Sequence, residues 1–192
     1  TVFLPARKDF YTLVSDRIME ILRSYADVRD NEDAFEQISI DEAFVEITEK
    51  TGGDFNLAFN TGIRIKNEIK EKEQLTCSVG IGPNKLIAKM TSSVQKPDGI
   101  TVISPDKLKS FLWPLKVSKL WGIGNVTAGK LQEMGIVTIK DLAEYNVIDL
   151  ISTFGKTRGI WLKQAAAGID DSPVKEREGS EQIGRIATLP DD

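Results

Sequence analysis

The apolar residues of this chain change their spacing near residue 103, and this change constrains the fold more than any other feature of the sequence. Before it, helical spacing alternates with short apolar runs that are typical of strands. After it, the strand patterns end, and short helical segments separated by glycines continue to about Gly168. We therefore expect an α+β domain over residues 1–103 and a small all-α domain over residues 104–169.

The first domain carries three helix patterns and four strand patterns. Residues 7–25 and 55–73 repeat apolar side chains at three- and four-residue intervals, which predicts two amphipathic helices. Two short apolar runs, separated only by Asp41 and Glu42, predict a tight hairpin over residues 35–47. The expected elements that follow are a strand, a helix and a strand, over residues 75–81, 85–94 and 100–103. This order predicts a mixed or antiparallel sheet with helices on one face.

The end of the chain differs in composition from the rest. Residues 170–182 are charged and almost free of apolar side chains, which is typical of a linker. Residues 183–189 alternate again, as the first strand of a further β domain would. The chain also starts at Thr1 without an initiating Met. We expect the sequence to be a fragment of a longer protein, cut at both ends.

The side chains that are missing limit the possible chemistry. There is no His among the 192 residues, and Cys77 is the only thiol. Disulfides, Cys/His zinc sites and catalytic triads with an imidazole base are therefore excluded within this chain. Catalysis would have to use carboxylates, amines, hydroxyls or a hard metal ion. Cys77 itself lies in a strand-like pattern and is expected to fill the core.

The overall composition is that of a soluble globular protein. It is 41% hydrophobic and 28% charged. No window approaches 18 consecutive apolar residues, and the first ten residues lack the pattern of a signal peptide. We expect a cytoplasmic protein, or a nuclear one if the source is eukaryotic, with no membrane contact.

The formal net charge of −4 hides an uneven distribution along the chain. Residues 1–60 carry 6 basic and 13 acidic side chains, residues 61–130 carry 12 and 5, and residues 131–192 carry 7 and 11. A basic block in an acidic chain is compatible with a protein that meets phosphate groups over one local face. The alternative is an ordinary solvated surface, and charge alone does not separate the two.

The Asp41-Glu42 pair is the first candidate site. Two-residue hairpin turns favour Asn-Gly or Asp-Gly, so turn propensity does not explain this pair. Adjacent carboxylates between apolar strands repel each other unless a cation lies with them, and Mg²⁺ takes one or two protein carboxylates together with phosphate oxygens. The alternative is a solvated acidic turn, which is the more common setting of such a dipeptide.

Residues 117–136 predict a helix-hairpin-helix. A short helix, the turn Gly122-Ile123-Gly124 and a second helix that ends at Gly135 fit this motif. Its glycines let the protein backbone come close to a phosphate, so N–H groups at the start of the second helix can bind it. Such contacts read the DNA backbone without base specificity. The alternative is a plain helical hairpin. The expected DNA-binding residues here are Gly122, Ile123, Gly124, Val126 and Thr127.

Three lysines form the last candidate set. Lys85 and Lys89 share a helix face, and Lys96 precedes a turn of Pro97, Asp98 and Gly99. The glycines before Lys85 do not have the spacing of a P-loop, so that type of nucleotide site is rejected. Taken singly, each lysine fits a solvated surface better than a binding site.

Four segments together resemble one protein family in their order and spacing. They are Ser39-Ile40-Asp41-Glu42-Ala43-Phe44, Cys77-Ser78-Val79-Gly80-Ile81-Gly82-Pro83-Asn84-Lys85-Leu86-Ile87-Ala88-Lys89, Gln95-Lys96-Pro97-Asp98-Gly99-Ile100 and Trp121-Gly122-Ile123-Gly124. The sequence resembles Y-family DNA polymerases of the DinB, or DNA polymerase IV, branch. This resemblance runs from Phe3 to about Thr188.

The resemblance implies a division into domains. Residues 1–103 would form a palm that lacks its first strand, residues 104–169 a thumb, residues 170–182 a tether, and residues 183–192 the start of a little-finger domain. The family's first catalytic Asp and its fingers domain have no counterpart in this sequence. The chain alone is therefore expected to be inactive.

The resemblance also implies a function and its residues. Asp41 and Glu42 would be catalytic, metal-binding carboxylates, and Lys96 would reach the triphosphate of the incoming deoxynucleotide. Lys85 and Lys89 are expected to face DNA. The complete protein would be a monomeric translesion polymerase that extends primer-template DNA with two Mg²⁺ ions, and regions outside this chain would reach a sliding clamp. The alternative is a catalytically silent DNA-binding module that keeps only the helix-hairpin-helix.

Overall fold

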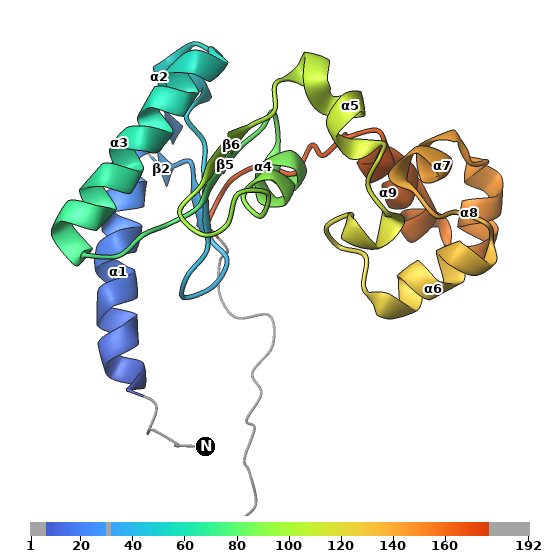
Figure 1. The fold of residues 1–192 in the computed structure, drawn as a ribbon, viewed down its shortest axis with the longest axis horizontal. Coiled ribbons are helices and arrows are strands. Elements are labelled where there is room, and N and C mark those ends of the chain that lie inside the picture. The colour runs from blue at the N-terminus through green and yellow to red at the C-terminus, as the bar shows by residue number, and fades with distance from the viewer. Residues whose placement is uncertain (1–6, 30–31, 177–192) are drawn as a thin grey trace, which may run out of the picture.

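Helices and short strands alternate in the first part of the chain, and helices alone form the second part (Figure 1). The computed structural model describes residues 7–29 and 32–176. The predicted α+β class is confirmed. None of the described helices is long and apolar enough to cross a membrane. The strands are β1 (Val28–Arg29), β2 (Glu32–Asp33), β3 (Phe35–Gln37), β4 (Ala43–Val45), β5 (Val79–Ile81) and β6 (Ile100–Val102). The helices are α1 (Lys8–Tyr25), α2 (Thr48–Thr51), α3 (Phe55–Glu73), α4 (Lys85–Thr91), α5 (Leu108–Leu112), α6 (Asn125–Glu133), α7 (Ile139–Glu144), α8 (Val147–Phe154) and α9 (Lys156–Ala166).

In the described residues, six strands form three two-stranded sheets. β1–β2 and β3–β4 are antiparallel, whereas β5–β6 is parallel. Alternate residues of β5 face opposite helices. A Cβ added to Gly62 of α3 would lie 3.4 Å from Cδ1 of Ile81, whereas one added to Gly80 would lie 2.1 Å from the carbonyl oxygen of Ala88 in α4. The sheet of β5 and β6 therefore has α3 on one face and α4 on the other.

The predicted hairpin is present, but its turn is longer than the two residues expected. Gln37 pairs with Ala43, so residues 38–42 form the loop. The N–H groups of Ile38 and Ser39 both donate to the carbonyl oxygen of Glu42, at 2.8 and 3.2 Å. These bonds close a five-residue turn, which removes the unfavourable backbone geometry that a two-residue Asp-Glu turn would need.

Several element boundaries also differ from the sequence predictions. The strand expected over residues 75–81 is confined to β5, and the helix expected over residues 85–94 ends at Thr91. The elements β1, β2 and α2 were not expected at all. A buried carboxylate explains α2: Asp27 is 1% exposed and accepts hydrogen bonds from the N–H groups of Glu49 and Lys50, at 2.7 and 3.0 Å. Asp27 thus satisfies free donors at the start of α2 although it lies 22 and 23 residues before them in the sequence.

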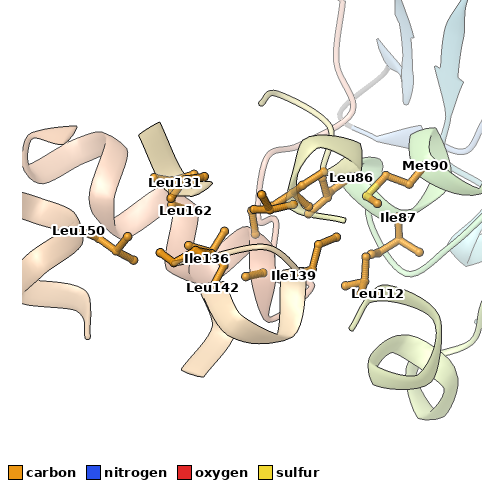
Figure 2. Packing of buried hydrophobic residues seen from close by; sticks show 14 residues of the cluster. Leu86, Ile87, Met90, Leu112, Leu131, Ile136, Ile139, Leu142, Leu150 and Leu162 are labelled. Atoms are coloured by element: carbon orange, nitrogen blue, oxygen red, sulfur yellow. The ribbon is translucent and has the colours of Figure 1, made fainter. Parts of the chain in front are cut away.

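One continuous apolar core joins α4 to the helices that follow β6. Leu86, Ile87 and Met90 of α4 pack in the same cluster as Leu112 of α5 and Ile139 of α7 (Figure 2). Because these residues belong to one cluster, the apolar face of α4 packs directly against the helices that follow β6. The division into domains stays a prediction. The cluster continues through Leu131, Ile136, Leu142, Leu150 and Leu162.

The described part of the predicted linker, residues 170–176, is hydrogen-bonded to the first part of the chain. After α9 the chain runs back towards the strands as an extended segment, residues 168–176, which we call the return segment (Figure 1). The expected start of a further domain at residues 183–192 lies outside the described residues. Four hydrogen-bonded contacts anchor the return segment: Asn84 Nδ2 to Gly168 O at 2.8 Å, Leu86 N to Asp170 Oδ2 at 3.0 Å, Lys85 Nζ to Pro173 O at 3.1 Å, and Arg23 to Glu176 at 3.0 Å.

Candidate functional site

A cleft of about 1370 Å³ collects half of the expected site residues. Its wall includes Asp41 and Glu42 from the β3–β4 loop, Lys85 and Lys89 from α4, and Lys96 from the turn before β6. The structure thus brings together five residues that are up to 55 positions apart in the sequence. The helix-hairpin-helix residues do not line this cleft.

The β3–β4 loop holds the two carboxylates in different surroundings. Asp41 is exposed and accepts a hydrogen bond from Ser39 Oγ at 2.6 Å. Glu42 is half-buried, and its Oε1 lies 2.5 Å from Lys89 Nζ. The loop is fixed to α1 by a hydrogen bond from Ser15 Oγ to the carbonyl oxygen of Ile40. The chain therefore presents one carboxylate to the cleft and keeps the other beside a cation.

This donor set suits a hard cation. Mg²⁺ is held by one or two carboxylates together with waters and phosphate oxygens, and Asp41 and Glu42 supply that number. Within residues 7–29 and 32–176, no three acidic or sulfur side chains gather as a complete metal cage. An ion bound here would therefore depend on oxygen ligands from elsewhere, such as substrate phosphates.

Lys85 has protein partners on three sides. Its Nζ lies 2.5 Å from Glu36 Oε2 and donates to the carbonyl oxygen of Pro173 at 3.1 Å. It also lies 5.4 Å from the centre of the Phe44 ring. The side chains of Lys85 and Glu36 are only 12% and 4% exposed. Lys85 thus joins β3, β4 and the return segment, and its expected contact with DNA stays a prediction.

Lys96 is exposed at the rim of the cleft, and Lys66 of α3 braces the turn that carries it. Lys66 Nζ donates to the carbonyl oxygens of Cys77 and Asp98, at 2.6 and 2.8 Å, and pairs with the Asp98 carboxylate. The hydrogen bond from Lys66 lowers the pKa of Asp98, so this carboxylate stays ionised and keeps its partner. Burial raises the pKa of the Cys77 thiol, as expected for a core residue.

The predicted helix-hairpin-helix is present, although its first helix is only a 3₁₀ turn, Val117–Lys119. Gly122 has φ +89°, which glycine adopts without strain. The second helix is α6, and Gly124 stands at its N-cap with no side-chain hydrogen bond to the first turn. The first N–H groups of a helix have no partner inside it, so Asn125, Val126 and Thr127 present donors here. Val126 is 88% exposed, so an anion can reach this helix end.

An aromatic contact joins the two candidate surfaces. Trp121, next to the glycine turn, meets Phe44 edge to face with ring centres 6.0 Å apart. Phe44 follows Glu42 by two residues, so the helix-hairpin-helix is braced against the strand that leads out of the carboxylate loop. The partners Glu36 and Lys66 were not among the residues expected for the site, because each acts through a contact with a distant segment.

Comparison with known proteins extends these observations along the whole chain. Residues 1–93 match the family model described as the impB/mucB/samB family, and residues 105–136 match the IMS family HHH motif. A DNA polymerase IV from Methanosarcina acetivorans is 78% identical over 191 residues, and one from Nitrosopumilus maritimus is 44% identical. These alignments cover 100% of this chain but 52% and 51% of the relatives, so the chain spans about half their length.

Solved structures agree with the sequence comparison. A Y-family DNA polymerase chimera, Dbh-Dpo4(243-245)-Dbh, has a TM-score of 0.84 at 35% identity, over 93% of this chain and 50% of that one. DinB from Sulfolobus solfataricus has a TM-score of 0.80 at 36% identity, over 91% of this chain and 49% of that one. The matches agree in sequence and in fold, and the chain belongs to the DinB-like Y-family of DNA polymerases.

Proposed function

We propose that this chain is the part of a translesion DNA polymerase that carries two metal-binding carboxylates, a triphosphate-binding lysine and a DNA-backbone grip. Its partners are primer-template DNA and a deoxynucleoside triphosphate. One observation carries the proposal: Asp41, Glu42 and Lys96 line one cleft, and the helix-hairpin-helix is braced against the same hairpin through Trp121 and Phe44. A neighbour whose title is "Insertion ternary complex of Dbh DNA polymerase" supports the choice of partners.

The residues have separate roles in this proposal. Asp41 and Glu42 would hold Mg²⁺, which in such a site stabilises the developing charge on phosphate oxygens. Lys89 holds the Glu42 carboxylate at the cleft wall, and Lys96, which lines the same cleft, attracts the triphosphate. The N–H groups at the start of α6 bind a backbone phosphate, since neutral donors at a helix N-terminus favour anions. None of these contacts reads a base, so the chain binds DNA without sequence preference.

The remaining parts of the proposal follow from the family. The complete protein acts as a monomer in the cytoplasm, uses two Mg²⁺ ions, and contacts a sliding clamp through segments outside this chain. The chain alone is expected not to extend a primer. The second candidate function, a DNA-binding module without catalysis, rests on the exposed start of α6, which needs none of the cleft residues.

A chimera tests the polymerase against the binding module. In it, residues 1–192 replace the matching stretch of the Methanosarcina acetivorans relative, which supplies the other half of the protein. The 78% identity makes the new junctions conservative. Extension of a primer by this chimera, at a rate near that of the unmodified relative, is the result expected of a polymerase. A chimera that binds duplex DNA but adds no nucleotide would favour the binding module.

Lys96→Ala in this chimera is expected to raise the KM for the deoxynucleotide about tenfold, the effect of one lost charged contact of 1 to 2 kcal/mol. Duplex affinity should stay within about twofold, because Lys96 lines the cleft and no residue of α6 does. Steady-state kinetics and a DNA titration measure the two effects. The control is Lys70→Ala, because Lys70 is also an exposed lysine but lies on α3. A Lys96 variant that loses only DNA affinity would contradict the triphosphate role.

The chain by itself is expected to bind duplex DNA weakly, with Kd on the order of 10⁻⁴ to 10⁻⁵ M near physiological salt and no preference between two unrelated sequences. Gly124→Val should abolish most of this binding, because its side chain would cover the donors of α6. The φ of Gly124 is −85° and an added Cβ meets no atom within 4 Å, so the variant should fold.

Fluorescence anisotropy measures this binding, and circular dichroism confirms folding. Gly129→Val is the matched control, since Gly129 lies in the same helix, has the same open surroundings and is away from the helix start. A folded Gly124→Val chain that binds DNA as tightly as the control would remove the helix-hairpin-helix as the DNA grip.

A further inference from the structure

The turn that presents the α6 donors is held by a residue of α9 that lies 36 positions further along the chain. Arg158 of α9 donates from Nη2 to the carbonyl oxygen of Gly122 at 2.6 Å. The other bond that shapes the turn is internal, from Ile123 N to the carbonyl oxygen of Leu120 at 3.0 Å. The guanidinium therefore fixes the peptide that immediately precedes Ile123 and the α6 N-cap.

Trp161, which lies one turn after Arg158 on α9, packs against Gly122. A Cβ added to Gly122 would lie 2.8 Å from Trp161 Cη2, so the glycine backbone rests directly on the indole. Arg158 stacks over that indole, with its guanidinium carbon 4.2 Å from the ring centre. Stacking and hydrogen bonding together leave the guanidinium a single orientation.

We propose that Arg158 and Trp161 are positioning residues for DNA binding, because they hold the Gly122–Gly124 turn in the shape that aims the α6 donors at a phosphate. This inference rests on the proposed function of the helix-hairpin-helix. No side chain caps α6, so its donors owe their direction to the turn alone. A guanidinium held by a protein carbonyl and an indole acts on DNA through the turn that it fixes.

The role differs from that of a plain DNA-binding cation, and a charge-preserving substitution separates the two. Lysine keeps the charge of Arg158 but has neither the planar fork nor the stacking surface. For a simple cation, Arg158→Lys would leave affinity unchanged. For a positioning residue, it releases Gly122 and lowers affinity, while the number of phosphates neutralised and hence the salt dependence stay the same.

The experiment uses the whole chain and a duplex oligonucleotide. Arg158→Lys is expected to lower the affinity for the duplex about tenfold, which corresponds to the loss of one charge-assisted hydrogen bond. The slope of log K against log salt should stay unchanged. In ¹H–¹⁵N spectra of the free protein, the amide signals of Gly122 and Ile123 should move while those of α1 and α3 stay in place. Lys156→Arg, the reverse exchange at an exposed cation two residues away, is the control and should change none of these.

Trp161→Phe provides a second test should Arg158→Lys not fold, and it should also lower affinity and move the Gly122 signal. Wild-type affinity in a folded Arg158→Lys or Trp161→Phe chain would overturn the positioning role and leave the DNA-binding function intact. Absence of DNA binding by the wild-type chain would overturn the DNA-binding function itself, and the positioning role with it. The two failures are therefore distinguishable.

Discussion

Replacing Asp41 with Asn or Glu42 with Gln in the chimera is expected to lower the rate of nucleotide addition about 10³-fold or more, since a metal ligand supports several kcal/mol of transition-state stabilisation. Both substitutions keep the size of the side chain and remove its negative charge. Asp41 is exposed in the cleft and Glu42 is held by Lys89, so neither supports the core. The free energy of unfolding should therefore change little.

Single-turnover primer extension measures this effect, and DNA affinity is measured on the same samples. Affinity should stay within about threefold of the unsubstituted chimera, because the helix-hairpin-helix residues do not line the cleft. Glu71→Gln, at an exposed acid on α3, controls for the loss of one negative charge. Turnover within a few-fold of the unsubstituted chimera for both variants would mean that these carboxylates do not bind the catalytic metal.

Lys85→Met is expected to lower the free energy of unfolding of the chain by about 3 kcal/mol, because it removes a largely buried ion pair with Glu36 together with the hydrogen bond to Pro173. The pair with Glu36 is 2.5 Å long and nearly enclosed, and the same lysine also anchors Pro173. Adding Glu36→Gln should recover much of the loss, since a neutral pair of similar volume needs no counter-charge.

Urea unfolding followed by circular dichroism measures these free energies from the shift in midpoint. Lys89→Met serves as the control, because the Lys89–Glu42 pair is 23% and 36% exposed and should contribute less than about 1 kcal/mol. Equal and small losses in the two methionine variants would show that Lys85 is a surface cation, free to contact DNA. A large loss specific to Lys85 would make it the joint between β3, α4 and the return segment.

Periodicity alone predicted the long helices well. Residues 7–25 and 55–73 became α1 and α3 with nearly the expected ends, because both helices bury an apolar stripe that local sequence encodes. The glycine turn and α6 were also found, since Gly122 and Gly135 mark positive φ angles that few other residues adopt. In these places local propensity and tertiary packing favour the same conformation.

The predictions failed where distant groups decide the local structure. The helix α2 forms under a carboxylate that lies in a different loop. The β3–β4 turn differs for a local reason, since the N–H groups of Ile38 and Ser39 converge on the carbonyl oxygen of Glu42 within the loop itself. Contacts between side chains and distant segments could not be predicted either. Glu36 and Lys85 are 49 residues apart, and Arg158 and Gly122 are 36 apart, so neither contact leaves a periodic signal in the sequence. The candidate site was thus predicted as a set of residues, without the contacts that position them.

Template dependence of nucleotide addition by the unsubstituted chimera tests the central claim most directly. Primer extension is measured with each deoxynucleotide in turn on four templates that differ only in the first unpaired base. If residues 1–192 form the catalytic and DNA-holding half of a polymerase, the chimera should add the complementary nucleotide at each template base, with a preference similar to that of the unmodified Methanosarcina acetivorans relative. A folded chimera that binds the primer-template but adds no nucleotide, or adds one regardless of the template, would contradict the claim.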